Sequence, residues 1–184
     1  GLGNQFLSHI FATDAILLLL RQFHDENIPA LASGPQEEYE ILLEELRKKD
    51  EKLAAKPRLV VCNTAAGEKD FWEGCELTIN ALEEKEKLPR LIQKAYQTLN
   101  LITFYTIKGG KEVSAWPILK EANLAEAAAK VHTDFKEKFI RAEVIDIEKL
   151  LKAGSWPRAR ELGWIKTEGK DWTLKDGEVI EFKI

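Results

Sequence analysis

The sequence predicts an α/β protein built in two parts. Two uninterrupted apolar runs, residues 15–20 and 59–62, have the composition of buried strands, and we expect the first to be covered on both faces of a parallel sheet. Residues 36–53 and 88–99 place apolar side chains at helical spacing. Beyond residue 98 the pattern changes to short β-branched and aromatic segments. We therefore expect one domain over residues 1–98 and a second over residues 99–184.

The composition is that of an ordinary globular chain. Its 184 residues, 45% of them hydrophobic, suit one or two small domains with a core of their own. With 31 acidic and 27 basic residues the net charge is −4, which does not indicate nucleic-acid binding by bulk charge, and we expect no DNA partner. The first apolar run is far shorter than the roughly 20 residues of a membrane span, and no signal peptide is recognisable. We expect a cytoplasmic protein with no membrane partner.

Neither the cysteines nor the histidines predict a metal site. Cys62 and Cys75 show no framework spacing, so we interpret them as one buried and one surface thiol in a reducing compartment. His24 is followed by Asp25 and Glu26, but adjacent residues do not by themselves form a ligand set. We expect no metal ligands among them.

The first half also contains a candidate ligand position. Asn63 directly follows the second apolar run, and open α/β sheets bind ligands at the carboxyl ends of their strands. A helix is expected over residues 4–9, whereas residues 64–80 have no clear pattern.

The second half predicts a hairpin, a helix and further short strands. Gly109 and Gly110 mark the hairpin turn, Asn123 is a candidate N-cap, Asp146 is another, and Gly154 ends the helix that Asp146 begins. This order is expected of a β-grasp, ubiquitin-like domain. The expected strands are 101–107, 112–119, 140–145, 164–166, 171–174 and 179–183, and the expected helices are 124–131, 147–152 and 155–162.

Several stretches together resemble one known family. Residues 132–135 (HTDF) and 139–145 (FIRAEVI) are similar to the TGS signature of the YchF/Obg-like ATPases, supported by residues 111–116, 168–172 and 175–180. Residues 1–10 (GLGNQFLSHI) resemble the segment that follows the Asp-x-x-Gly motif of these NTPases. The resemblance covers essentially all of residues 99–184 and much of residues 1–63.

The resemblance implies a partial Ras-like P-loop NTPase domain with a helical insertion at 36–53, followed by a β-grasp TGS domain. It implies ATP or GTP binding and hydrolysis with Mg²⁺ in the parent protein, and association with the ribosome or its RNA. The chain has no G-x-x-x-x-G-K-[ST] phosphate loop, so we expect it to be a carboxy-terminal portion of a longer protein or an ordered part of one, with its enzymatic status open. The alternatives are a non-catalytic ribosome- or RNA-binding module and a scaffold that has lost nucleotide function.

The resemblance also implies site residues. In the family an asparagine at a strand end and an acidic residue three positions later recognise the base. Asn63 matches, but the third position is Ala66 and the next acid is Glu68, so Asn63 and Glu68 are the nucleotide candidates. The candidates near the switch region are Gly1, Gly3, Asn4 and His9, with a surface or capping role as the alternative for His9. Leu18 occupies the position of a family histidine implicated in hydrolysis.

Basic residues of the second half are candidates for RNA or ribosome contact. They would bind phosphates in a salt-dependent manner, although solvated side chains, and a structural corner for the histidine, are the alternatives. These candidates are Lys108, Lys111, His132, Arg141 and Lys170.

Overall fold

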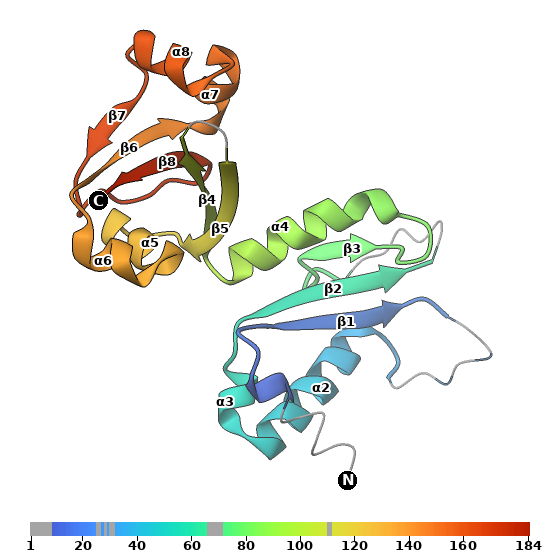
Figure 1. The fold of residues 1–184 in the computed structure, drawn as a ribbon. Helices are drawn as coiled ribbons and strands as arrows, with labels where there is room; N and C mark the ends of the chain where they lie inside the picture. The colour runs from blue at the N-terminus through green and yellow to red at the C-terminus, as the bar shows by residue number, and fades with distance from the viewer. Residues whose placement is uncertain (1–8, 25–26, 28, 30–31, 66–71, 110–111) are drawn as a thin grey trace. The chain divides into compact units, whose positions relative to one another are not determined.

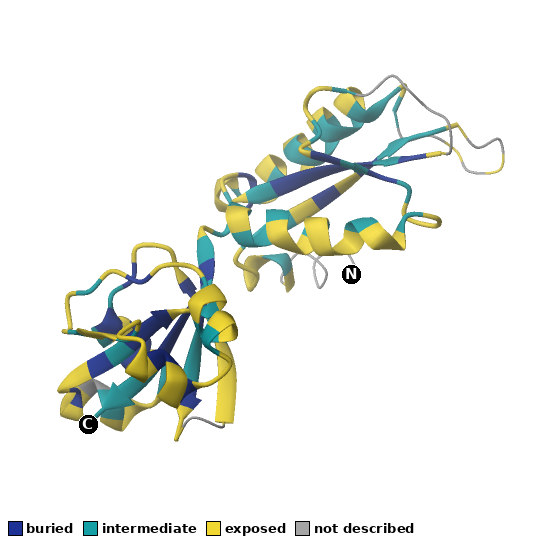
Figure 2. Ribbon diagram, turned by 90° about the horizontal axis from the view of Figure 1, so that it is seen from above, coloured by how far each residue is buried: buried dark blue, intermediate teal, exposed yellow. Residues whose placement is uncertain are grey.

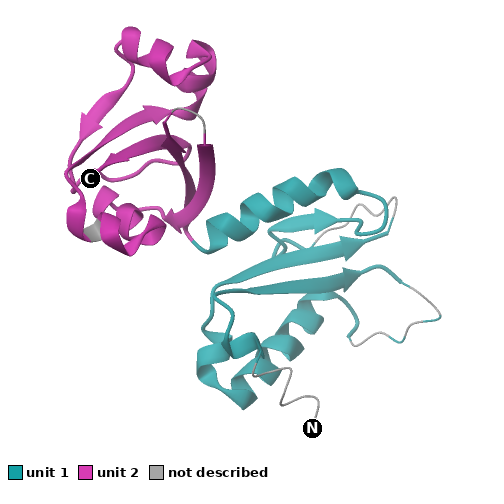
Figure 3. Cartoon of the chain, viewed as in Figure 1, with its two compact units in different colours: residues 1–99 teal, residues 100–184 magenta. Residues whose placement is uncertain are grey.

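The computed structural model describes residues 9–24, 27, 29, 32–65, 72–109 and 112–184. It divides into two compact units, Gly1–Leu99 and Asn100–Ile184, which we describe separately (Figures 1 and 3). Asn100, at the start of the second unit, has a φ of 52°, in the left-handed region that asparagine tolerates. Both units mix helices and strands, which confirms the predicted α/β class.

The first unit contains a parallel sheet in the order β1-β2-β3. Its central strand, β2, pairs with β1 along its whole length, with Leu20 opposite Cys62, and with β3 through Asn63 opposite Ile79. The elements are β1 (Ile16–Gln22), α2 (Pro35–Lys49), α3 (Glu51–Ala54), β2 (Arg58–Thr64), β3 (Leu77–Ile79), η1 (Lys85–Lys87) and α4 (Leu88–Thr98).

Two helices cover opposite faces of this sheet. On one face the buried side chains of β1 and β2 pack against Tyr39 and Leu42 of α2. On the other face, β2 and β3 pack against Leu91 and Ala95 of α4. Figure 2 shows that the buried residues concentrate on the strands, while the outer helix surfaces are exposed.

The expectation that both faces of the first strand are covered is wrong. Leu18 and Leu20 are buried, but Leu17 and Leu19 on the other face are 45% and 48% exposed. Since α4 packs over β2 and β3, this face of β1 is left partly open in the described part of the chain.

The predicted helix over residues 36–53 is two helices. Asp50 interrupts it with an extended backbone, φ −166° and ψ 131°. Its carboxylate accepts a hydrogen bond from the Lys52 amide at 2.8 Å, so Asp50 caps α3 and ends α2. Aspartate favours this role because its side chain replaces a missing backbone partner.

The interpretation of the cysteines as two thiols is also wrong. Cys62 and Cys75 form a disulfide, with Cα atoms 5.8 Å apart. Cys62 lies in the core on β2, and Cys75, just before β3, packs against the same cluster. Because β3 pairs in parallel with β2, the chain brings Cys75 back beside Cys62. The separation of 13 residues between the two cysteines did not indicate this in the sequence.

The second unit has the β-grasp topology that the sequence predicted. Its sheet has the order β5-β4-β8-β6-β7, in which β4 and β8 are parallel and the other pairs are antiparallel. The elements are β4 (Leu101–Lys108), β5 (Glu112–Leu119), α5 (Leu124–Val131), α6 (Thr133–Lys138), β6 (Arg141–Asp146), α7 (Ile147–Ala153), α8 (Trp156–Glu161), β7 (Lys166–Glu168) and β8 (Glu178–Lys183).

Alternate residues of this sheet face two cores. Ile102 and Phe104 of β4 pack with Ile180 of β8 and with α5. Ile107 of β4 lies on the opposite face, in a cluster that contains Trp156 of α8. This period of two is the expected geometry of strands that are covered on both faces.

The predicted caps are confirmed. Asn123 forms a capping box with Glu126, and the Asp146 carboxylate accepts hydrogen bonds from the amides of Glu148 and Lys149. Gly154 ends α7 with a φ of 77°. Residues 171–174 were expected to form a strand, but they form a loop with one bridge, Asn123 to Thr173. The helix α6 was not predicted.

Among the described residues, every helix falls short of the length and apolar character that a bilayer crossing demands.

An ion cluster joins α8 to the sheet. The Arg160 guanidinium lies 2.6 Å from Glu143, and the Lys183 amine lies 3.5 Å from Glu143 and 2.7 Å from Glu181. Partial burial opposes ionisation of Glu143, but the Arg160 hydrogen bond and both cations outweigh it and hold the pKa of this carboxyl below its ordinary value.

We expect Asn123→Ala to lower the free energy of unfolding by about 1 kcal/mol, because the Glu126 amide loses its partner. Urea unfolding, together with amide exchange in α5, would measure this. Asn123→Ser keeps an acceptor and should stay within a few tenths of a kcal/mol of the wild type. Equal loss in both variants would contradict the capping role.

We expect Glu143→Gln to destabilise the chain at neutral pH by no more than about 1 kcal/mol, because the cluster is partly solvated. Because the pKa of Glu143 is lower in the folded chain than in the unfolded chain, where it is near 4.5, its ionisation stabilises the fold at pH values above 4.5. This stabilisation is lost as the pH falls through the pKa of the folded state. The difference from wild type should therefore vanish in acid. Unfolding titrations at several pH values would test this, with the exposed Glu161→Gln as control.

Candidate functional site

The candidate site lies at the carboxyl edge of the parallel sheet in the first unit. Because β1, β2 and β3 are parallel, they end on the same side, at Gln22, Thr64 and Ile79. The chain must leave this edge through loops, whose backbone groups and side chains are free to face a ligand.

Asn63 fixes the turn that follows β3. Its Oδ1 accepts a hydrogen bond from the Ala81 amide at 3.0 Å. The neighbouring Thr64 hydroxyl donates to the Ile79 carbonyl at 3.4 Å, and Asn80 Oδ1 accepts from the Leu82 amide. The Asn63 side chain is thus held at the end of β2 with its oxygen engaged.

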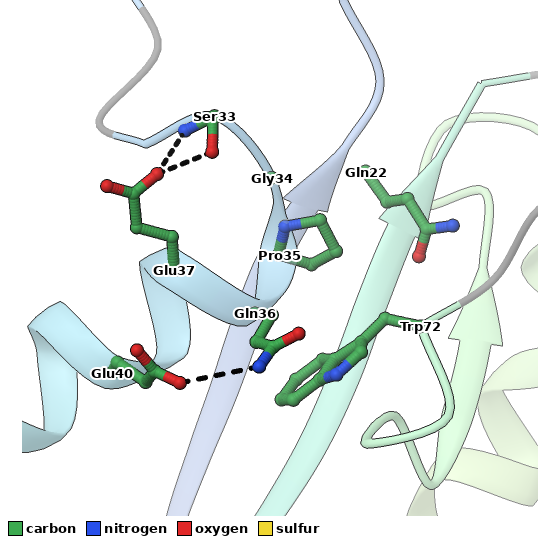
Figure 4. A pocket seen from close by; sticks show the side chains of 8 residues that line it. All are labelled: Gln22, Ser33, Gly34, Pro35, Gln36, Glu37, Glu40 and Trp72. Atoms are coloured by element: carbon green, nitrogen blue, oxygen red, sulfur yellow. Dashed lines mark hydrogen bonds between the residues drawn. The ribbon is translucent and has the colours of Figure 1, made fainter.

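A cavity of about 810 Å³ opens at the same edge, between the end of β1 and the start of α2 (Figure 4). Trp72 forms an aromatic wall, and its ring lies 5.4 Å from that of Tyr39. The remaining lining is mostly polar. It comprises Gln22, Ser33, Gly34, Pro35, Gln36, Glu37 and Glu40.

The electrostatics of this cavity do not suit a phosphate group. The Ser33 hydroxyl and amide both donate to Glu37, at 2.5 and 2.8 Å, and they lower the pKa of its carboxyl. Glu37 and Glu40 both line the cavity, and among its described lining residues there is no lysine, arginine or histidine. An uncharged aromatic group with polar edges fits this lining better.

The structure does not bring His9 together with Asn63. His9 is exposed in a helical turn before β1. This turn lies near the amino end of β2, because the Lys56 amine, just before β2, donates a hydrogen bond to the carbonyl of Phe11 in the turn. Asn63 lies at the carboxyl end, about 20 Å away along a seven-residue strand. Gly1, Gly3, Asn4, Glu68 and Lys111 lie outside the described residues.

The basic candidates of the second unit occupy different places. Lys108, Arg141 and Lys170 are exposed, at the end of β4, the start of β6 and the loop after β7. His132 caps α6, where its Nδ1 accepts a hydrogen bond from the Asp134 amide at 3.1 Å. This bond requires an unprotonated Nδ1, so a cationic His132 at the end of α5 would lose it.

Trp72 and the start of α2 were not identified from the sequence. Trp72 fell in the stretch without a clear pattern, and Gln36 was assigned to an amphipathic helix. The strand-end rule that selected Asn63 could also have selected Gln22, which ends β1.

Metal ligands do not converge at this edge: the described parts of the chain hold no group of three histidine, cysteine, aspartate or glutamate side chains that could bind an ion.

These features define a class of protein in which a unit with a parallel α/β sheet, of the kind that binds ligands at its carboxyl edge, is followed by a β-grasp unit. A family model, YchF-GTPase_C, described as a protein of unknown function (DUF933), matches residues 101–184. The chain is similar to the YchF/Obg-like ATPases, and the family model matches its carboxy-terminal part.

Named relatives extend this match. The ribosome-binding ATPase YchF of Mycoplasma genitalium is 44% identical over 102 residues, which are 55% of this chain and 28% of that protein. The YchF of Bacillus subtilis is 37% identical over 128 residues, 68% of this chain and 35% of that protein. Obg-like ATPase 1 of Gallus gallus is 27% identical over 285 aligned positions, covering 100% of this chain and 71% of that protein.

The fold has a solved counterpart. The YchF GTPase of Schizosaccharomyces pombe superposes with a TM-score of 0.76 at 22% identity, covering 100% of this chain and 75% of that chain. This chain spans less than a third of the Mycoplasma genitalium protein. The alignment with the Gallus gallus protein is longer than the 184 residues of this chain, so it opens gaps in it.

We expect Asn63→Ala to release the turn after β3. Losing one hydrogen bond should speed exchange of the Ala81 amide by a factor of about 5. Hydrogen exchange followed by NMR would measure this, and Asn63→Asp, which keeps an acceptor, is the matched control. Unchanged exchange in Asn63→Ala would show that the turn does not depend on this amide.

Proposed function

We propose that this chain is part of a ribosome-associated nucleotide-binding protein, and that its first unit supplies the base-binding half of an ATP or GTP site. The observation that carries the proposal is the carboxyl edge of the sheet, where Asn63 is the last residue but one of β2 and a cavity with an aromatic wall opens nearby. The names of the relatives, ribosome-binding ATPase YchF and Obg-like ATPase 1, support the same class of function.

The chemistry of the edge favours the base over the phosphates. With its Oδ1 bonded to the Ala81 amide, the Asn63 side chain can donate to the edge of a purine through Nδ2, and the Trp72 ring offers a face for stacking. The anionic side chains Glu37 and Glu40 would repel a triphosphate, and the sequence has no phosphate loop. We therefore propose that the phosphates are bound by a part of the parent protein outside these 184 residues.

Mg²⁺ is expected with the nucleotide in the parent protein, but the described residues do not form a ligand set for it. When bound, Mg²⁺ would neutralise phosphate charge. The proposed contribution of this chain is to hold and orient the base: Trp72 would stack on it in the cavity, and Asn63, which does not line the cavity, would approach it from the edge of the sheet.

The open face of β1 is consistent with a larger domain. Leu17 and Leu19 are half exposed, and β1 is an edge strand of the described sheet. Additional strands of the parent protein would pair with this edge, and helices connected to those strands would cover both leucines, as in a Ras-like sheet.

The second unit is the proposed ribosome-binding part. The family match lies entirely within it, and Lys108, Arg141 and Lys170 present exposed cations. A non-catalytic binding module is therefore the second candidate function for the chain as it stands.

The first experiment is a titration of ATP and GTP, with Mg²⁺, against this chain and against the full product of its gene. We expect binding by the full product and none of comparable strength by the chain, because the phosphate contacts carry most of the affinity. Asn63→Ala in the full product should weaken binding by about tenfold, as expected for a lost base contact.

The control is Asn80→Ala, which removes a neighbouring amide from the turn after β3. Equal weakening by both variants would assign the effect to the turn and would contradict a base contact by Asn63. Absence of binding by the full product would reject the nucleotide function and leave the binding module as the leading function.

Ribosome binding is tested separately by cosedimentation of this chain at increasing salt. We expect retention that falls with salt and is weakened by combined alanine substitution of Lys108, Arg141 and Lys170. The acidic-to-neutral variant Glu161→Gln serves as a control for nonspecific charge effects. Salt-independent binding, or none, would contradict the proposed phosphate contacts.

A further inference from the structure

The outer strand of the second unit, β5, has an unpaired edge. In the sheet order β5-β4-β8-β6-β7 it pairs with β4 on one side, and no other described strand lies on its other side. An exposed strand edge presents a row of backbone donors and acceptors that can pair with another extended segment.

The hydrogen-bond pattern identifies the outward groups. The Thr103 amide donates to Asp176 and its carbonyl accepts from Gly177, both at 2.8 Å, so both backbone groups of Thr103 point away from β5. Thr103 is opposite Pro117, and these two residues are therefore a pair without mutual hydrogen bonds.

By alternation along the ladder, the backbone groups of Val113, Ala115 and Pro117 face outward. Pro117 has no N–H, so the edge offers the amides of Val113 and Ala115 and the carbonyls of all three. Within the described residues, the Val113 and Ala115 amides have no backbone hydrogen-bond acceptor.

A cavity lies beside the same strand. Its volume is about 380 Å³, within the range of small-ligand sites, and it opens on the face of the sheet that carries α5 and α6. Glu112, Ser114 and Trp116 of β5 line it at every second position. Phe135 of α6 and Phe182 of β8, whose rings lie 5.9 Å apart, form an apolar wall.

These two observations fit one kind of occupant. A strand added to β5 would place alternate side chains on the cavity face, opposite Ser114 and Trp116. Residues 113–117 carry no charge, so a partner with charged residues directly opposite them would lose hydration without gaining an ion pair; the charged residues of the cavity lining, Lys108, Glu112 and Glu181, lie outside this stretch. On the opposite face, Val113 and Leu119 are 58% and 59% exposed and offer further apolar contact.

We infer that β5 binds an extended, uncharged peptide segment of a partner protein by strand addition, with one large apolar side chain of that segment seated in the cavity. This inference does not depend on the proposed nucleotide function. The Val113 and Ala115 amides supply the main-chain bonds, and the aromatic wall selects the anchor.

The probe is a blocked heptapeptide in which threonine alternates with valine and a central phenylalanine, titrated into the ¹⁵N-labelled chain. We expect saturable shifts and slowed exchange at the Val113 and Ala115 amides. The Ser114 and Trp116 amides, which already face β4, should change little in exchange. Replacing the central phenylalanine of the peptide with alanine should weaken binding by about tenfold or more.

Two variants of the chain separate the parts of the site. Ala115→Pro removes an outward donor at a position equivalent to Pro117, so the β4–β5 ladder is kept, and we expect about tenfold weaker binding. Ala115→Thr keeps the donor and is the matched control. Ser114→Leu should fill the cavity. We expect it to lower the affinity for the phenylalanine peptide and to leave the affinity for the alanine peptide unchanged.

The inference is overturned if the peptide protects neither amide, or if Ala115→Pro binds as well as Ala115→Thr. Equal affinity for the phenylalanine and alanine peptides would contradict the seating of an apolar side chain in the cavity. Concentration-dependent protection of both amides without peptide, with a dimer seen by sedimentation, would make a second copy the occupant and would replace the proposed partner.

Discussion

Each unit depends on one strand that is buried on both faces. In the first unit this strand is β2, whose side chains alternate between the α2 core and the α4 core. In the second it is β8, which lies between β4 and β6 and places Ile180 and Val179 in opposite cores. β1 and β3 pair with β2, and β4 and β6 pair with β8 and carry the outer strands β5 and β7, so the position of each loop at a sheet edge follows from these two strands.

Local signals in the sequence predicted much of this framework. Apolar runs located β1 and β2, and polar residues before helices located the caps at Asn123 and Asp146. Long-range pairing could not be obtained in this way. The exposure of Leu17 and Leu19 depends on where α4 packs, and the Cys62–Cys75 bond depends on the return of the chain at β3. Asp50 shows the opposite case, since one polar residue ended a helix that periodicity alone would continue.

The candidate site was predictable in part for the same reason. The end of a buried strand is a local feature, so Asn63 could be selected before its surroundings were known. Its partner, the Ala81 amide, and the wall formed by Trp72 come from segments that meet only after the sheet forms. The acidic character of the cavity likewise results from the approach of α2 to β1, and it agrees with the expectation from the sequence that this edge serves the base and not the phosphates.

Pro117 has a consequence for how the outer strand can be used. A strand edge that is open along its whole length can act as a template, because each added strand presents a fresh edge to the next molecule. The missing donor at Pro117 leaves the Val113 and Ala115 amides as the uninterrupted outward pair, which restricts the addition to a short segment. The same surface can therefore hold a transient partner in a crowded cell while resisting the stepwise stacking that leads to fibres.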